Sequence, residues 1–114
     1  MRASILVVDD DAAVRNVLGL FLSREGYDVA EAEDGWAGLK AAAAERFDLV
    51  VADVFMPGLS GVDMVRDILR LQPGIQVVMV SGYDDGLERY GVQLVKPVRP
   101  AELLAVVRRL LGEG

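Results

Sequence analysis

Acidic side chains stand at two places where an apolar segment of this sequence ends. Asp9 and Asp10 follow the apolar run Ser4–Val8, and Asp53 ends another apolar run just before a Met-Pro-Gly turn. Carboxylates held close together repel one another, which raises at least one pKa or destabilises the fold. A divalent cation would offset this repulsion. The sequence has no histidine and no cysteine, so a site built from oxygen ligands suits Mg²⁺, or Mn²⁺, rather than zinc.

Two groups that bind anionic oxygens follow two further apolar runs. Ser81 comes directly after Ile75–Val80, and Lys96 comes directly after Val92–Val95. A metal ion, an ammonium group and a hydroxyl around one carboxylate form a cradle for a phosphoryl group, because phosphoryl transfer depends mainly on positioning and charge stabilisation. Asp53 is the expected nucleophile, and its attack would form an acyl phosphate. Among these acids it alone belongs to the third of the five strands predicted below, which is the middle strand.

Short apolar runs alternate along the chain with longer segments of helical periodicity. The runs predict four strands, and the alternating segment Tyr27–Ala32 predicts a fifth; the runs are Ser4–Val8, Phe47–Asp53, Ile75–Val80 and Val92–Val95. The spacing of apolar residues predicts four full helices: from the cap Asp11 to Gly26, Trp36–Arg46, from the cap Ser60 to Gln72, and from Pro100 to Gly112.

This alternation predicts one α/β domain over residues 1–114, with a doubly wound, five-stranded parallel sheet between layers of helices. In an open sheet of this kind, ligands bind beyond the carboxyl ends of the strands. The residues expected there are Asp9, Asp10, Asp53, Ser81 and Lys96. The sequence therefore predicts a single site at one edge of the sheet.

Composition limits the classes of protein to consider. Of 114 residues, 53% are apolar and 26% are charged, which is typical of one folded domain. No apolar run approaches the roughly 20 residues that span a bilayer, so membrane insertion is not expected. The net charge of −6 and the pI near 4.5 argue against direct binding of nucleic acid. The lack of cysteine fits a reducing cytosol, and we expect a cytoplasmic protein.

Four segments resemble the signature segments of response-regulator receiver domains of two-component signalling. They are ILVVDDD, VVADVFMPGLSG, VVMVSG and LVKP, which stand in the family's order and span essentially the whole chain. The resemblance implies a flavodoxin-like receiver fold with strand order 2-1-3-4-5. It also implies a switch that accepts phosphate on Asp53 from a histidine kinase or a histidine phosphotransfer protein. Such a switch catalyses its own phosphorylation and dephosphorylation but is not a conventional enzyme.

The resemblance further assigns roles to single residues. The implied metal ligands are Asp9, Asp10, Asp53 and the main-chain carbonyl of Phe55. Ser81 matches the switch hydroxyl and Lys96 the invariant lysine, so these two and Asp53 form the implied catalytic group. Pro97 matches a proline whose preceding peptide bond is usually cis in the family.

Partners follow from the same resemblance. We expect a stand-alone or excised receiver domain, since the sequence ends at Gly114 without an effector domain, and a monomer or weak dimer. Output is expected through contacts with an unknown downstream protein. The expected surface is formed by the fourth crossover, the last strand and the last helix, where Arg99, Arg108 and Arg109 lie.

The chain departs from the family pattern between Ser81 and Lys96. Only fourteen residues separate them, and the last strand takes four, which leaves Gly82–Gly91 for the crossover. A whole crossover with its helix needs at least about 10–12 residues. We therefore expect a shortened fourth helix, with at most one turn at Glu88–Tyr90.

A second departure concerns switching. Three residues before the lysine, where most receivers carry Tyr or Phe, this chain has Gln93. Tyr83 and Tyr90 are the candidates to replace that ring. The hypothesis is that phosphorylation orders Gly82–Gly91 as Ser81 engages the phosphate.

Three other interpretations stay open at this point. Asp9 and Asp11 form the D-x-D of metal-dependent aspartyl phosphatases, although 114 residues leave little room for the cap domain of that class. A degenerate receiver would bind partners without phosphorylation, but it would not need the complete acidic set. A flavodoxin-like cofactor protein fits poorly, because an acidic first loop disfavours a flavin phosphate. For Asp11 alone, the structural interpretation as a helix N-cap is preferred.

Overall fold

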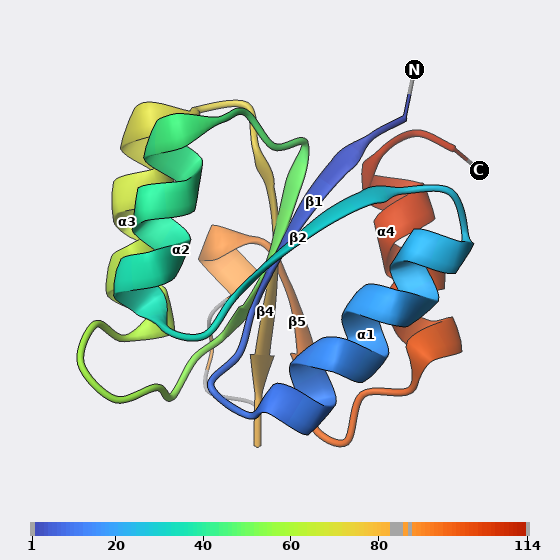
Figure 1. The fold of residues 1–114 in the computed structure, drawn as a ribbon, viewed down its shortest axis with the longest axis horizontal. Coiled ribbons are helices and arrows are strands. Elements are labelled where there is room, and N and C mark those ends of the chain that lie inside the picture. Colours follow the sequence, from blue (N-terminus) through green and yellow to red (C-terminus); the bar gives the residue numbers. More distant parts are fainter. Residues whose placement is uncertain (1, 83–85, 87, 114) are drawn as a thin grey trace.

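The computed structural model describes residues 2–82, 86 and 88–113. In this part of the chain a five-stranded parallel sheet has the order β2-β1-β3-β4-β5, which confirms the predicted fold class and strand order (Figure 1). The strands are β1 (Ser4–Val8), β2 (Asp28–Ala32), β3 (Leu49–Asp53), β4 (Gln76–Ser81) and β5 (Val92–Val95).

Helices cover both faces of the sheet. In the described residues they are α1 (Ala12–Arg24), α2 (Gly35–Ala44), α3 (Gly61–Leu71) and α4 (Pro100–Leu110). Figure 1 shows α2 and α3 together on one face and α1 and α4 on the other. This is the doubly wound arrangement expected from strands that alternate with helices. No helix within the described residues is long and apolar enough to cross a membrane.

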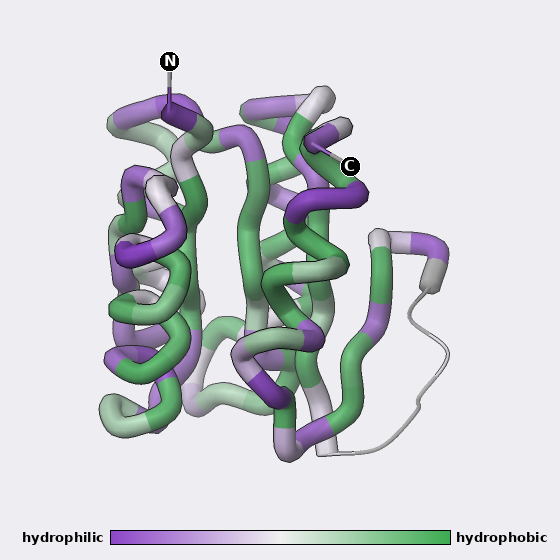
Figure 2. The backbone as a smooth tube through the Cα atoms, turned by 90° about the vertical axis from the view of Figure 1, so that its right-hand side faces the viewer, coloured by the Kyte–Doolittle hydropathy of each residue, from purple (hydrophilic) through white to green (hydrophobic). Residues whose placement is uncertain are grey.

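Each face of the sheet has its own apolar core. The core against α2 and α3 includes Leu6, Val8, Val50, Ala52, Met64 and Ile68. The core against α1 and α4 includes Ile5, Val7, Val51, Leu18, Leu22 and Leu103. Because successive side chains of a strand point to opposite faces, β1 and β3 are apolar on both faces, with polar residues only at Ser4, where β1 begins, and at Asp53, where β3 ends. In Figure 2 the strands are hydrophobic over most of their length, and hydrophilic segments gather at the turns.

The second helix ends earlier than predicted. The expected range was Trp36–Arg46, but α2 ends at Ala44, and Glu45 has an extended backbone (φ −150°, ψ 163°). The side-chain amide of Gln72 donates to the carbonyl oxygens of Ala42 and Glu45, each at 2.8 Å. Gln72, a residue far away in the sequence, therefore satisfies the hydrogen bonding of carbonyl groups at the end of α2. Every predicted bound, including this one, lies within two residues of the structure.

The crossover between β4 and β5 confirms the expected shortened fourth helix. Among its described residues the regular element is η1 (Glu88–Tyr90), a single turn of 3₁₀ helix. Gly91 then returns the chain to the sheet, and a Cβ there would overlap the carbonyl oxygen of Val77. Tyr83 lies outside the described residues, so its suggested aromatic role stays a prediction.

Candidate functional site

The register of the sheet brings the predicted site residues to one edge. Asp9 and Asp53 each directly follow a paired residue of β1 and β3, so they are neighbours. Strands β4 and β5 pair up to Ser81, and Lys96 directly follows β5. All four residues lie at the carboxyl ends of parallel strands, where an open α/β sheet binds its ligands.

Three carboxylates form the centre of this edge. One oxygen from each of Asp9, Asp10 and Asp53 lies within 4.8 Å of the other two. Asp9 and Asp53 are only 3% and 4% exposed, whereas Asp10 faces solvent. Mg²⁺ takes one or two carboxylates and keeps several waters, so a partly open cluster of oxygen donors fits it. The donor set therefore fits the cation expected from the sequence.

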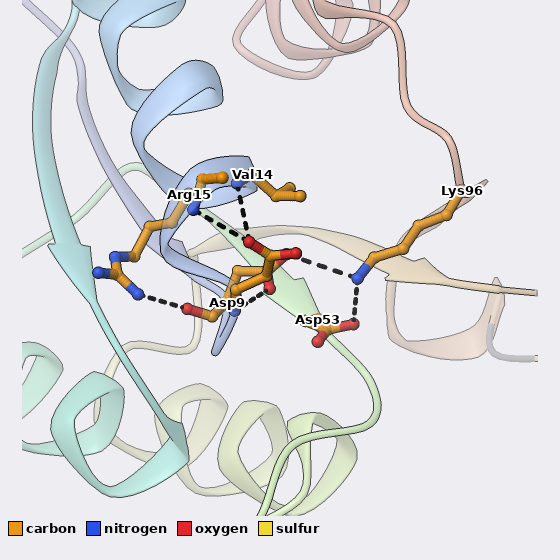
Figure 3. A network of polar contacts seen from close by, with 7 residues as sticks. Asp9, Val14, Arg15, Asp53 and Lys96 are labelled. Carbon is orange, nitrogen blue, oxygen red and sulfur yellow. Dashed lines mark hydrogen bonds and ion pairs between the residues drawn. The ribbon is translucent and has the colours of Figure 1, made fainter.

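Lys96 reaches into this cluster from the end of β5. Its Nζ lies 3.3 Å from Oδ1 of Asp53 and 3.6 Å from Oδ2 of Asp9 (Figure 3). Burial opposes the charged form of the ammonium group, but the carboxylates of Asp53 and Asp9 outweigh it and raise the pKa of Lys96. Lys96 is therefore a fixed positive charge. The bond between it and Pro97 is cis, as the resemblance implied.

The carboxyl group of Asp53 is destabilised as an anion. Burial and the neighbouring charge of Asp9 raise the pKa of Asp53 from 3.8 to about 6, although Lys96 pulls it downward. One lysine therefore does not balance the acids at this edge. With a pKa of about 6, the carboxylate is still largely ionised at neutral pH, as a nucleophile must be.

The first loop holds Asp9 in a fixed direction. Oδ1 of Asp9 accepts a hydrogen bond from the backbone N–H of Asp11 at 2.9 Å, which leaves Oδ2 on the side of Lys96. Asp11 accepts from the backbone N–H groups of Ala13 and Val14 at 3.0 and 3.3 Å. Asp11 is thus the N-cap of α1, and the structural interpretation of this residue is confirmed.

The chain after Asp53 folds tightly back over it. The N–H of Gly61 donates to the carbonyl oxygen of Val54 at 2.9 Å, and a Cβ on Gly61 would overlap the carbonyl oxygen of Asp53. Glycine is needed at this close approach. Phe55 lies in the intervening turn and is 57% exposed. The expected contact between its main-chain carbonyl and a metal stays a prediction.

Ser81 is buried at the end of β4, with only 1% of its surface exposed. The amide Nε2 of Gln93 donates to its Oγ at 3.2 Å. In the sequence, Gln93 was notable only because it stands where most receivers carry an aromatic residue. Its hydrogen bond to Ser81 was not predicted. The register of the sheet explains the bond, because Met79 pairs with Gln93, which puts Gln93 and Ser81 on the same face of adjacent strands; this register is not evident from the sequence.

Arg15 is a second residue that the sequence did not single out. From the first turn of α1, its guanidinium donates to the carbonyl oxygen of Asp9 (Figure 3). It also pairs with Glu31 on β2. An arginine on a helix is by default a solvated residue, so the only sequence signal was its position just after three aspartates.

Comparison with protein families gives a match over most of the chain. A family model described as response regulator receiver domain matches residues 5–108. The DNA-binding response regulator MtrA of Mycobacterium tuberculosis (strain ATCC 25618 / H37Rv) is 39% identical, in an alignment that covers 97% of this chain and 51% of MtrA. The transcriptional regulatory protein ResD of Bacillus subtilis is 34% identical and matches over 96% of this chain and 48% of ResD. The chain thus spans about half the length of these curated relatives.

Solved structures show the same fold. A CheY-like response regulator receiver domain protein from Methanospirillum hungatei has a TM-score of 0.91 at 32% identity, over 99% of this chain and 96% of that one. The response regulator TrrA from Thermotoga maritima, in complex with Mg²⁺-BeF, has a TM-score of 0.86 at 31% identity, over 95% and 98% of the two chains.

Proposed function

This chain belongs to the response regulator receiver family, and on that premise we propose that it is a phosphoacceptor switch of a two-component phosphorelay. A histidine kinase or a histidine phosphotransfer protein donates the phosphoryl group to Asp53 in a Mg²⁺-dependent reaction. The observation that carries this proposal is the cluster of Asp9, Asp10 and Asp53 within 4.8 Å, with Nζ of Lys96 3.3 Å from Asp53. As a receiver, the chain is a signalling phosphoacceptor rather than a classical enzyme.

The residues of the edge divide the work of phosphoryl transfer. A carboxylate oxygen of Asp53 attacks phosphorus, and the P–N bond to the donor imidazole breaks as the new O–P bond forms. The ammonium group of Lys96 and the hydroxyl of Ser81 then bind phosphoryl oxygens. Mg²⁺, when bound by Asp9, Asp10, Asp53 and the carbonyl of Phe55, neutralises charge on the transferring group. Mn²⁺ is a chemically acceptable substitute.

An apolar groove beside Lys96 supports docking of a protein donor. Its volume is about 350 Å³, and its lining consists of Val14, Leu18, Val80, Lys96, Pro97 and Val98. A side chain of the donor seated there would place its phosphohistidine next to the site. Charging the groove by Val98→Glu should slow transfer from a phosphorylated protein donor while leaving phosphorylation by acetyl phosphate unchanged.

We further propose that residues 1–114 form one cytoplasmic receiver domain, which is a monomer or weak dimer. Its output is a contact with an unidentified downstream protein at η1, β5 and α4, where Arg99, Arg108 and Arg109 are exposed. Relatives such as MtrA are named as DNA-binding, but the match covers only about half of them. DNA binding is therefore not proposed for this chain, in line with its net charge of −6.

The test is phosphorylation by acetyl phosphate, followed by intact mass. Wild type with Mg²⁺ should gain the mass of one phosphoryl group, and both chelation of the metal and the substitution Asp53→Asn should prevent the gain. Labelling that persists in Asp53→Asn would contradict the proposal. Continuous turnover of a phosphate ester by the wild type would instead favour an aspartyl phosphatase.

A further inference from the structure

Arg15 ties the loop that carries the acidic pair to strand β2. Its Nη1 donates to the carbonyl oxygen of Asp9 at 2.8 Å, and its Nε lies 3.4 Å from Oε1 of Glu31 (Figure 3 shows the bond to Asp9). We propose that Arg15 is a positioning residue for the metal site, which fixes the peptide between Asp9 and Asp10 and so aims both carboxylates. This inference rests on the proposed function, since that function requires the cation.

Burial makes the contacts of Arg15 more than a surface ion pair. Its side chain is only 16% exposed, and that of Glu31 is 35% exposed. A surface pair between mobile side chains contributes little, but a guanidinium held between a carboxylate and a carbonyl oxygen is confined in both position and direction. Lysine, with a single point charge, cannot reproduce both contacts.

Gly19 leaves the space that Glu31 occupies. A Cβ on Gly19 would lie 2.7 Å from Oε2 of Glu31. A glycine within a helix costs about 0.5–1 kcal/mol relative to alanine, so its place inside α1 calls for a reason. Room for the carboxylate that braces Arg15 is such a reason. Helix α1 and strand β2 thus jointly support the first loop.

The bond from Arg15 acts at the link between the two acids. The carboxylate of Asp9 is already held by burial and by the N–H of Asp11, whereas Asp10 is exposed. The carbonyl that Arg15 binds belongs to the peptide that leads to Asp10. Loss of this bond should therefore mainly free Asp10 to turn away from Asp53, which weakens the cation site without unfolding the domain.

The experiment measures Mg²⁺ affinity by calorimetry at constant ionic strength. Arg15→Met should bind Mg²⁺ about tenfold more weakly than wild type, as is typical when a group that orients metal ligands is removed. Glu31→Gln should shift the affinity in the same direction by less, and it serves if Arg15→Met fails to fold. Arg70→Met is the matched control, because it removes the same charge from an exposed pair with Asp67 in the last turn of α3.

Arg15→Lys separates positioning from charge. If positioning is the role, the lysine variant should bind Mg²⁺ nearly as weakly as Arg15→Met. Recovery of wild-type affinity in Arg15→Lys, or an equal loss in Arg70→Met, would overturn the inference, because charge alone would then explain the effect.

A readout without metal completes the test. In excess chelator, Arg15→Met should speed amide hydrogen exchange at Asp10 and Asp11 while exchange in the central strands stays as in wild type. Unchanged exchange there would overturn the inference. The proposed function fails separately, if wild type at saturating Mg²⁺ takes no phosphoryl group on Asp53.

Discussion

The two ends of the sheet bury polar groups in opposite ways. At the amino ends of the strands, the neutral amide of Gln72 accepts from the N–H of Phe47 at 2.9 Å and donates to the carbonyl oxygens of Ala42 and Glu45. At the carboxyl ends, the carboxylates of Asp9 and Asp53 are equally buried, but they repel each other. The first end is satisfied by the fold alone, and the second is not.

This difference separates stability from function. A buried neutral group with all its hydrogen bonds made stabilises a fold, whereas buried like charges destabilise it until a ligand compensates them. A protein that keeps such charges at the ligand-binding end of its sheet gains a site for a cation and a phosphoryl group. Substitutions at the two ends should therefore have opposite signatures.

The largest effect is expected from Lys96→Met. It removes the ammonium group that stabilises the transferred phosphoryl oxygens, so the rate of phosphorylation by acetyl phosphate should fall about 10²–10³-fold. The measurement is the rate of mass gain at saturating Mg²⁺. Lys40→Met is the control, because Lys40 is the other lysine of the chain and is exposed on α2. Equal rates for the two variants would remove Lys96 from the site.

At the opposite end, Gln72→Ala should reduce stability and spare chemistry. It leaves the N–H of Phe47 and the carbonyls of Ala42 and Glu45 without the amide, which should lower the free energy of unfolding by about 2–3 kcal/mol. Urea unfolding measures this, with the exposed Gln76→Ala as control. A folded Gln72→Ala protein that phosphorylates slowly would break the division between the two ends.

Removing the buried charge of Asp53 should increase stability, which is the reverse of the effect expected for Gln72→Ala. Because folding raises the pKa of Asp53 from 3.8 to about 6, the folded state holds this proton more tightly. The metal-free wild type therefore loses stability as pH rises through about 4 to 6. Above this window Asp53→Asn should be more stable than wild type by on the order of 1–2 kcal/mol, and below it the difference should vanish.

Thermal unfolding in excess chelator across this pH range tests the sign of that effect. A variant less stable than wild type at neutral pH would mean that the ion pair with Lys96 outweighs burial and the repulsion from Asp9. In the expected case, addition of Mg²⁺ should stabilise wild type more than Asp53→Asn, because the cation offsets the charge that the variant lacks.

The smallest effect is expected at the neutral contact of the carboxyl end. A double-mutant cycle with Ser81→Ala and Gln93→Ala should give a coupling of about 1 kcal/mol in the free energy of unfolding, typical of one hydrogen bond. Additive effects would show that Gln93 does not hold the hydroxyl of Ser81. Gln93, which stands where an aromatic ring was expected, would then have no role in holding Ser81.

Much of the difference between the two ends of the sheet was predictable from the sequence, because it depends on the order of residues along single strands. Strand β1 is apolar from Ile5 to Val8 and is followed directly by Asp9, so its burial on two faces and the acid at its carboxyl end follow together. The short crossover before β5 was predictable by counting residues. Asp11 was recognisable as a cap because the helix it caps follows directly.

Most of the missed contacts join residues that lie far apart in the sequence, except the bond from Arg15 to the carbonyl oxygen of Asp9, six positions away. Gln72 ends α2 across 27 to 30 positions, so the predicted extension to Arg46 had no local signal against it. Arg15 meets Glu31, and Gln93 meets Ser81, only once neighbouring strands are paired. Periodicity identifies the faces of single elements, but it does not show which polar side chains meet between elements.

The central claim is that Asp9 and Asp10 hold a hard cation against the carboxylate of Asp53. A crystal structure with Mn²⁺ and beryllofluoride tests it most directly, because the anomalous signal locates the metal and the beryllium marks the phosphoryl position. We expect beryllium bonded to a carboxylate oxygen of Asp53, with Mn²⁺ held by Asp53 and the Asp9–Asp10 pair and Lys96 beside the fluorides. Mn²⁺ bound elsewhere, or beryllofluoride away from Asp53, would contradict the account.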